Sequence, residues 1–237
     1  MIGDVVLLPH ELQPGGERAI VVLDVLRATT SIAAALAAGV PEVRVFQSLD
    51  EARRAAAGST AAHLLCGEER CLRPEGFDLG NSPGQFQTAH AGKLVFMSTT
   101  NGTRAIIAAQ QARILLVGAI VNAAAVARAL LGTGCDFVLL CAGTDGQVSM
   151  EDVLGAGAVL DAARQSTYVE LGSDCARIAL RLFHAARDQL RVALAQAQGG
   201  QNVIRAGLDA DIDFAARLNS IDAVGVVHRN PLRAVKF

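Results

Sequence analysis

Aromatic side chains are scarce in this chain of 237 residues, which has no tryptophan, one tyrosine and eight phenylalanines. Platforms on which nucleic-acid bases stack are built from aromatic side chains, so this scarcity argues against such a platform. A surplus of charge is also lacking, because 21 lysines and arginines stand against 23 aspartates and glutamates. Without a basic surplus the chain lacks the electrostatic footprint of a nucleic-acid-binding protein. We therefore expect no nucleic-acid partner.

Long hydrophobic runs are missing as well. The longest apolar stretch, residues 114–127, contains Asn122 and stops at Arg128, short of the roughly 18–20 apolar residues that a membrane-spanning helix needs. The first four residues place no basic segment before an apolar run, so the start of the chain does not resemble a signal peptide. We expect a cytoplasmic protein with no membrane partner.

Several motifs of known chemistry are absent. The five cysteines include no C-x-x-C pair, so neither a disulfide framework nor a zinc ribbon is expected. The five histidines lack the spacing of a His-rich metal site. The chain has no P-loop, no G-x-G-x-x-G after a strand and no G-x-S-x-G elbow. These absences argue against P-loop nucleotide binding, dinucleotide binding and an α/β-hydrolase triad.

What the sequence does contain is a plan that recurs three times. Apolar runs at 19–24, 94–97 and 137–141 are each followed by a polar or glycine-bearing turn and an alanine-rich helical pattern. Continuous apolar strands are typical of sheets covered on both faces. The pattern predicts one α/β domain over residues 1–237, with three αβα layers and a largely parallel or mixed sheet. Further strands are predicted at 43–46, 63–66, 114–117 and 223–227.

The last third of the chain is predicted to be mainly helical. A helix is expected over 174–197, ended by Gly199 and Gly200. A short helix over 206–217 is expected to turn Asp209, Asp211 and Asp213 toward water. The alanine-rich helices suggest a helix-packed homodimer.

Polar turns follow the predicted strands, where ligands bind in α/β sheets. One of them joins five hydroxyl or amide side chains to a glycine, and we interpret it as an anion site: Ser98, Thr99, Thr100, Asn101, Gly102 and Thr103. The simpler alternative is a capped helix, because these residue types are good caps. Five such side chains in six residues exceed what capping requires.

Asp24 ends a strongly apolar strand, where a carboxylate is costly unless it is paired or binds a metal. Arg27 and Thr30 follow within the next turn, so a metal and anion site is one interpretation and a helix-capping Asp24–Arg27 pair is the other. The loop 76–83 is shaped by glycines and carries Asp78 and Asn81.

A pair of acidic residues opens the helix predicted over 149–164. The favourable helix dipole explains Glu151 and Asp152 there sufficiently. A Mg²⁺ ligand role is the alternative, because hard cations take oxygen ligands.

Taken in order, these motifs resemble the 2-phosphosulfolactate phosphatase family. The resemblance covers roughly residues 1–165 and rests on segments 23–31, 67–68, 76–83, 98–103 and 141–143 with 151–152. It implies a Mg²⁺-dependent phosphatase that acts on phosphate esters of 2-hydroxy acids, a step that in methanogens yields sulfolactate on the way to coenzyme M. Two departures from the family pattern, at 69–71 and 84–85, are expected to alter the substrate pocket.

The resulting hypothesis is hydrolysis of a small anionic phosphate monoester. Mg²⁺ is expected to be held by Asp24 with Glu68 or Asp152, or with both. Asp24 is alternatively the nucleophile, and Asp78 is the expected general acid. The expected substrate-binding residues are Arg27, Thr30, Asn81, Ser98, Thr99, Thr100, Asn101, Gly102 and Thr103. A non-catalytic binding protein for a phosphorylated or sulfonated metabolite is the alternative.

Overall fold

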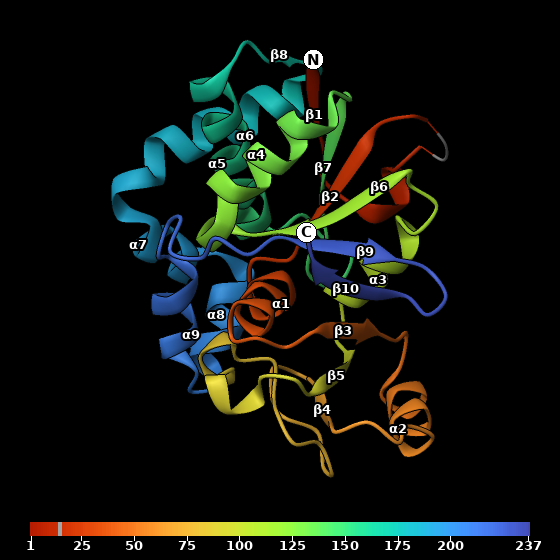
Figure 1. The fold of residues 1–237 in the computed structure, drawn as a ribbon. Helices are drawn as coiled ribbons and strands as arrows, with labels where there is room; N and C mark the ends of the chain where they lie inside the picture. Colours follow the sequence, from red (N-terminus) through yellow and green to blue (C-terminus); the bar gives the residue numbers. More distant parts are fainter. Residues whose placement is uncertain (14–15) are drawn as a thin grey trace.

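The computed structural model describes residues 1–13 and 16–237. Ten strands of these residues form one mixed sheet (Figure 1). In spatial order they are β4 (His63–Gly67), β5 (Leu94–Ser98), β3 (Glu42–Val45), β10 (Arg233–Lys236), β9 (Gly225–His228), β6 (Ile114–Gly118), β2 (Ala19–Leu23), β7 (Phe137–Cys141), β1 (Ile2–Val6) and β8 (Glu170–Leu171).

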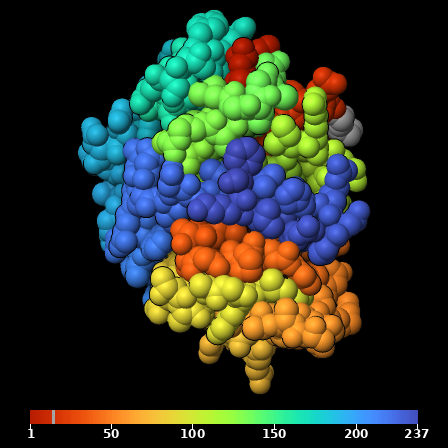
Figure 2. Space-filling view, viewed as in Figure 1, coloured from red at the N-terminus to blue at the C-terminus, as the bar shows by residue number. Residues whose placement is uncertain are grey.

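The sheet has two parallel parts. Strands β6, β2, β7, β1 and β8 run in one direction, and β3, β5 and β4 are parallel to one another. The antiparallel hairpin of β9 and β10 joins the two parts, pairing with β6 on one side and β3 on the other. In Figure 2 these C-terminal residues cross the middle of the molecule as a blue band, with green above and orange below.

Three antiparallel pairings in succession link β6 to β3, so β3, β5 and β4 run antiparallel to the strands of the other part. Strands twist by roughly 20–25° relative to their neighbours, so the five steps from β5 to β2 rotate the strand direction by about 100–125°. Figure 1 shows the result, with β1 and β7 upright and β9 and β3 lying across. The twist therefore turns the carboxyl ends of β2 and β5 toward a common space.

Helices cover both faces of the sheet. They are α1 (Ala28–Ala37), α2 (Leu49–Ala57), α3 (Gly102–Ala108), α4 (Ala123–Thr133), α5 (Met150–Ser166), α6 (Asp174–Ala186), α7 (Leu190–Gln196), α8 (Gln198–Arg205) and α9 (Asp209–Ala215). Short 3₁₀ turns cover Pro9–Glu11, Pro83–Gln85, Thr88–His90, Ile120–Asn122 and Arg187–Gln189. No helix among the described residues combines the length and apolar character that a bilayer crossing needs.

Strand β2 shows how the sequence produces two cores. Val21 and Leu23 pack with α4, α5 and α6 on one face, whereas Ile20 and Val22 pack with α1 and α3 on the other. Successive side chains of a strand point to opposite faces, so an unbroken apolar run serves both cores. The predicted three-layer αβα arrangement with a mixed sheet is confirmed.

The predicted strands are present within a few residues of their expected ends, whereas β1, β8, β10, α2, α4 and α8 were not predicted. The predicted end of a helix at Gly199 and Gly200 is wrong, because both glycines lie inside α8. A Cβ on Gly199 would lie 1.9 Å from Glu151 Oε1, and one on Gly200 would lie 1.8 Å from the Leu194 carbonyl oxygen. These glycines permit close packing rather than ending a helix.

Candidate active site

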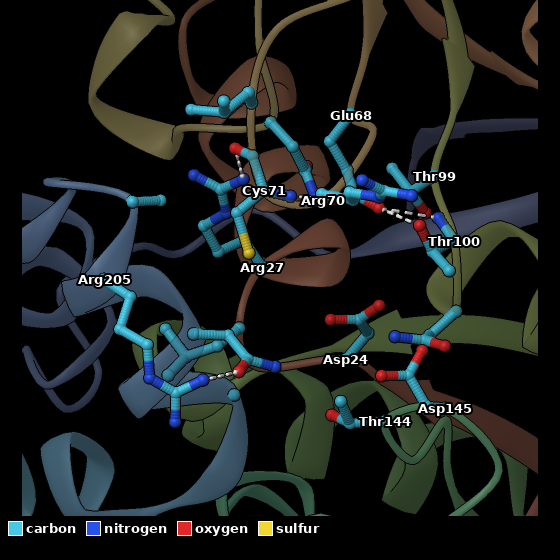
Figure 3. A pocket seen from close by; sticks show the side chains of 17 residues that line it. Asp24, Arg27, Glu68, Arg70, Cys71, Thr99, Thr100, Thr144, Asp145 and Arg205 are labelled. Carbon is cyan, nitrogen blue, oxygen red and sulfur yellow. Dashed lines mark hydrogen bonds between the residues drawn. The ribbon is translucent and has the colours of Figure 1, made fainter.

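A cavity of about 460 Å³ opens where the loops after β2, β4, β5 and β7 meet α8 (Figure 3). Its volume lies within the range of small-molecule sites. Seven of the residues predicted to form the site line it: Asp24, Arg27, Glu68, Asn81, Thr99, Thr100 and Asn101. The twist of the sheet thus brings together four motifs that are far apart in the sequence.

Asp24 follows β2 and is buried, with 6% of its surface exposed. Its Oδ1 accepts a hydrogen bond from the Ala28 amide at 3.1 Å, so it caps the first turn of α1. Burial raises the pKa of Asp24 to about 7, and repulsion from Glu68 and Glu151 adds to this, against the opposing effects of the Ala28 amide and Arg27. Asp24 is therefore a carboxylate that lacks sufficient positive charge around it.

Glu68 joins the loop after β4 to the loop after β5. Its Oε1 accepts hydrogen bonds from the Thr100 amide at 2.9 Å and from the Thr100 hydroxyl. Its Oε2 accepts from the Cys71 amide at 2.8 Å. These bonds hold the Glu68 carboxylate in the wall of the cavity that Asp24 also lines (Figure 3).

The polar segment after β5 divides into two roles. Thr99, Thr100 and Asn101 line the cavity. Thr103 does not, because its hydroxyl donates to the Thr99 carbonyl at 2.8 Å and the Thr103 amide donates to the Thr99 hydroxyl at 3.2 Å. Some side chains of the segment thus line the cavity and others stabilise the turn, and the anion site stays a prediction.

Gly102 supports the site from behind. A Cβ at this position would lie 2.5 Å from Asp24 Oδ2, so a side chain there would displace the carboxylate. Ser98 and Gly102 themselves do not belong to the cavity lining.

Arg27 lines the cavity but its guanidinium is already engaged. Nη1 donates to Asp211 Oδ2 at 2.6 Å and to Ser82 Oγ at 3.2 Å, and Nη2 donates to the Cys71 carbonyl at 2.6 Å. The capping pair of Asp24 and Arg27 is not an ion pair of the described residues; Arg27 pairs with Asp211 instead. The expectation that Asp211 faces water is wrong, because Asp211 is 5% exposed.

Besides Ser98, Gly102 and Thr103, three more predicted residues lie outside the cavity lining. Both carboxylate oxygens of Asp152 accept backbone hydrogen bonds, from Val25 at 2.8 Å and from Gly143 at 3.0 Å. The Thr30 hydroxyl donates to the Val25 carbonyl at 2.7 Å. Asp78 is exposed and accepts from the Leu65 amide at 2.7 Å. None of these three side chains lines the cavity, although Asp152 lies close enough to Asp24 that, after burial, the charge of Asp24 raises the pKa of Asp152.

The donor set of the cavity bears on Mg²⁺. No three histidine, cysteine, aspartate or glutamate side chains among the described residues form a metal-binding group. The cavity does hold the carboxylates of Asp24 and Glu68, and Asn81 Oδ1 is a buried oxygen without a hydrogen-bond partner. Mg²⁺ takes oxygen ligands and often only one or two carboxylates, with substrate phosphate and water completing its shell. The residues of the cavity fit such a site without Asp152.

Arg70 and Cys71, from the segment 69–71 that was expected to alter the pocket, line the cavity, whereas Asp145 and Arg205 line it without having been predicted as site residues. Arg70 and Cys71 occupy a two-residue turn closed by reciprocal backbone bonds between Glu69 and Leu72, at φ values of 51° and 69°. Left-handed backbone is uncommon outside glycine, and the sequence holds no glycine there to signal the turn. Arg205 comes from α8, and no local pattern links that helix to the strand ends.

The sequence matches one known protein family over most of its length. The model of the 2-phosphosulpholactate phosphatase family matches residues 6–230. The chain belongs to this family. The resemblance found in the sequence is thus confirmed, and with it the class of enzyme, the phosphoric monoester hydrolases.

Three relatives show how far the similarity extends. A protein of Carboxydothermus hydrogenoformans is 40% identical over 98% of this chain and 95% of its own. One from Synechococcus sp. (strain CC9605) is 41% identical over 93% and 90%, and one from Deinococcus radiodurans is 40% identical over 84% and 83%. All three are described as probable 2-phosphosulfolactate phosphatases.

Proposed function

We propose that this chain hydrolyses phosphate monoesters of small 2-hydroxy acids in a Mg²⁺-dependent reaction. The first candidate substrate is 2-phosphosulfolactate, the ester that appears in the descriptions of the relatives. Its hydrolysis yields the sulfolactate that methanogens use toward coenzyme M. The observation that carries the proposal is the buried Asp24 carboxylate facing a cavity that also holds Glu68 and the Thr99–Asn101 segment.

Each group of cavity residues has a distinct task in this reaction. Asp24 and Glu68, with the unpartnered oxygen of Asn81, would hold the metal ion. Bound Mg²⁺ supplies positive charge to the phosphoryl oxygens as the ester bond breaks. The Thr99 hydroxyl and the Asn101 amide would bind and orient those oxygens, and the Thr100 hydroxyl would hold the Glu68 carboxylate in place. Arg70 adds a cationic side chain to the lining.

Asp24 has two alternative roles, metal ligand and nucleophile. A nucleophilic Asp24 would carry the phosphoryl group as an acyl phosphate before water releases it. Acid quenching of the wild-type protein with a ³²P-labelled ester separates the roles. Label retained on the protein, and lost in Asp24→Asn, indicates the nucleophile; label found only in free phosphate indicates the ligand.

Phosphate release tests the proposed function directly. The substrates are 2-phosphosulfolactate, 2-phospholactate and 2-phosphoglycolate, each with Mg²⁺ and with EDTA. We expect release with Mg²⁺, none with EDTA, and none from a folded Asp24→Asn variant. An unchanged rate in EDTA would contradict the metal dependence, and no release from any ester would contradict the proposed activity.

A further inference from the structure

Three arginines line the cavity, and they differ in what they already bind. Arg27 is committed to Asp211, whereas Arg70 and Arg205 take part in no ion pair within residues 1–13 and 16–237. In Figure 3, Arg205 approaches from α8 on the far side of Asp24 from Thr99 and Thr100. A cationic side chain thus stands at the end of the cavity away from the hydroxyl groups.

Arg205 and Asp24 belong to different parts of the cavity lining, Arg205 to α8 and Asp24 to the end of β2, and they stand apart in Figure 3. A phosphoryl group beside Asp24 would therefore leave Arg205 available to a different part of the same ligand.

One face of α8 is built to present this arginine. Gly199, Asn202, Arg205 and Ala206 all line the cavity, at the three- and four-residue spacing of one helix face. Arg205 Nη1 donates to Asn202 Oδ1 at 3.1 Å, which positions the guanidinium. Its other N–H groups match the paired oxygens of a carboxylate or a sulfonate.

We propose that Arg205, positioned by Asn202, determines specificity by binding a second anionic group of the substrate, a carboxylate or a sulfonate. This inference rests on the proposed function and narrows it. The substrates are phosphate esters with another anionic group on the same small molecule, and esters with an uncharged remainder lose this contact.

The first test compares esters by the charge of their remainder. Isopropyl phosphate replaces the carboxylate of 2-phospholactate with a methyl group, and 2-phosphosulfolactate adds a sulfonate. We expect Arg205→Met to raise KM for 2-phosphosulfolactate by about 10–100-fold, the range of a charge-assisted hydrogen bond, and to raise KM for 2-phospholactate similarly where Arg205 binds the carboxylate. The change in kcat should be much smaller, and kcat/KM for isopropyl phosphate should stay the same.

Further variants separate binding from structure. Arg205→Lys should recover part of the loss, because it keeps the charge but not the paired donors. Asn202→Ala should raise KM by less than Arg205→Met. Arg181→Met on α6, an exposed arginine outside the cavity, is the matched control and should match wild type. The inference would be overturned if Arg205→Met lowered kcat/KM for isopropyl phosphate as much as for the acidic esters, or if it left KM for both acidic esters unchanged.

The rise in KM that Arg205→Met causes for 2-phosphosulfolactate, compared with the rise for 2-phospholactate, identifies the group that Arg205 binds. A loss confined to 2-phosphosulfolactate assigns the sulfonate, and a loss of similar size on both esters assigns the carboxylate. Each pattern supports a second anion site.

A binding measurement decides the matter independently of turnover. Sulfolactate and inorganic phosphate should each raise the Tm of the wild-type protein, since both bind the native state. Arg205→Met should lose the Tm shift with sulfolactate and keep the shift with phosphate. An unchanged sulfolactate shift in the variant, or none in wild type, would overturn the inference. Absence of phosphate release from every ester would instead contradict only the proposed function.

Discussion

Arg27 and Asp211 form a buried ion pair across 184 positions of the chain, with Nη1 and Oδ2 2.6 Å apart. The side chains are 2% and 7% exposed. Arg27 also donates to Ser82 and to the Cys71 carbonyl, so one guanidinium holds α9 and two cavity loops against the end of β2. The shape of the cavity therefore depends on a residue of α9 that does not itself line it.

Removal of the Asp211 carboxylate should lower the free energy of unfolding. Asp211→Ala leaves a buried guanidinium without its counter-charge, and breaking a buried pair in this way costs about 3–5 kcal/mol. We expect that loss in the free energy of unfolding, measured by urea denaturation. Asp213→Ala is the matched control, because the Arg191–Asp213 pair is about half exposed and should contribute less than about 1 kcal/mol. Equal effects of the two variants would contradict the structural role of the buried pair.

Gly102 is expected to tolerate no side chain. In Gly102→Ala the new Cβ would lie 2.5 Å from both Asp24 Oδ2 and the Ala28 Cβ. The Asp24 carboxylate or α3 must then move, and a displacement of about 1 Å can lower a rate about 100-fold. We expect a kcat loss of that order in phosphate-release assays.

Gly132→Ala provides the control for this substitution. Gly132 lies in α4, and a Cβ there would meet nothing within 4 Å. The change should leave kcat unaltered and raise stability by about 0.5–1 kcal/mol through helix propensity. Normal activity in Gly102→Ala would show that the carboxylate is not held as the structure places it.

The raised pKa of Asp24 predicts how stability depends on pH in EDTA. The folded pKa is about 7 against an ordinary 3.8, so the folded state binds this proton more tightly than the unfolded state. Its contribution to stability is complete below pH 3.8 and is lost as pH rises through 7. At about 1.4 kcal/mol per pH unit, the free energy of unfolding should fall by up to about 4 kcal/mol between pH 4 and 8.

Asp24→Asn isolates this effect from the titration of other groups. The variant cannot lose the proton, so its stability should fall less over the same range and exceed that of wild type at pH 8. Mg²⁺ should oppose the wild-type decline by pairing with the ionised carboxylate. Urea denaturation at several pH values would measure both curves, and parallel curves would contradict the raised pKa.

The sequence predicts the local parts of this site well, because strand, turn and helix patterns are local. The apolar run of β2 ending at Asp24 and the polar segment after β5 are recognisable from their composition. The roles of Arg27, Asp211 and Arg205 are not, since they depend on where α8 and α9 pack. Arg27 pairs with Asp211 rather than with Asp24 because of tertiary packing, and no local sequence pattern predicts this pairing.

Gly199 and Asp152 illustrate the same limit from the opposite side. A glycine pair resembles a helix end in sequence, yet Gly199 serves contact with Glu151. Asp152 resembles a metal ligand in the sequence, yet it lies outside the cavity lining and accepts the Val25 and Gly143 amides. Residue type indicates what a side chain can do, and its packed neighbours decide which of those tasks it performs.

Two threonines of one segment should respond differently to the same substitution. The Thr100 side chain lines the cavity, and its hydroxyl donates to the Glu68 carboxylate. The Thr100 amide donates to the same carboxylate, and a valine variant retains that second bond. Thr100→Val should therefore raise KM about 10-fold with little loss of stability. Thr103 is fully buried and its hydroxyl bonds only within the turn. Thr103→Val should cost about 1–2 kcal/mol of stability and leave KM unchanged.

Steady-state kinetics and urea denaturation of both variants would separate anion binding from capping within six residues. A KM effect in both would extend the binding surface to Thr103. A KM effect in neither would remove Thr100 from the binding surface and leave Thr99 and Asn101 as the only residues of the segment that could bind the anion. Only the divided result, in which Thr100 acts on KM and Thr103 on stability, agrees with the hydrogen bonds that the two side chains make.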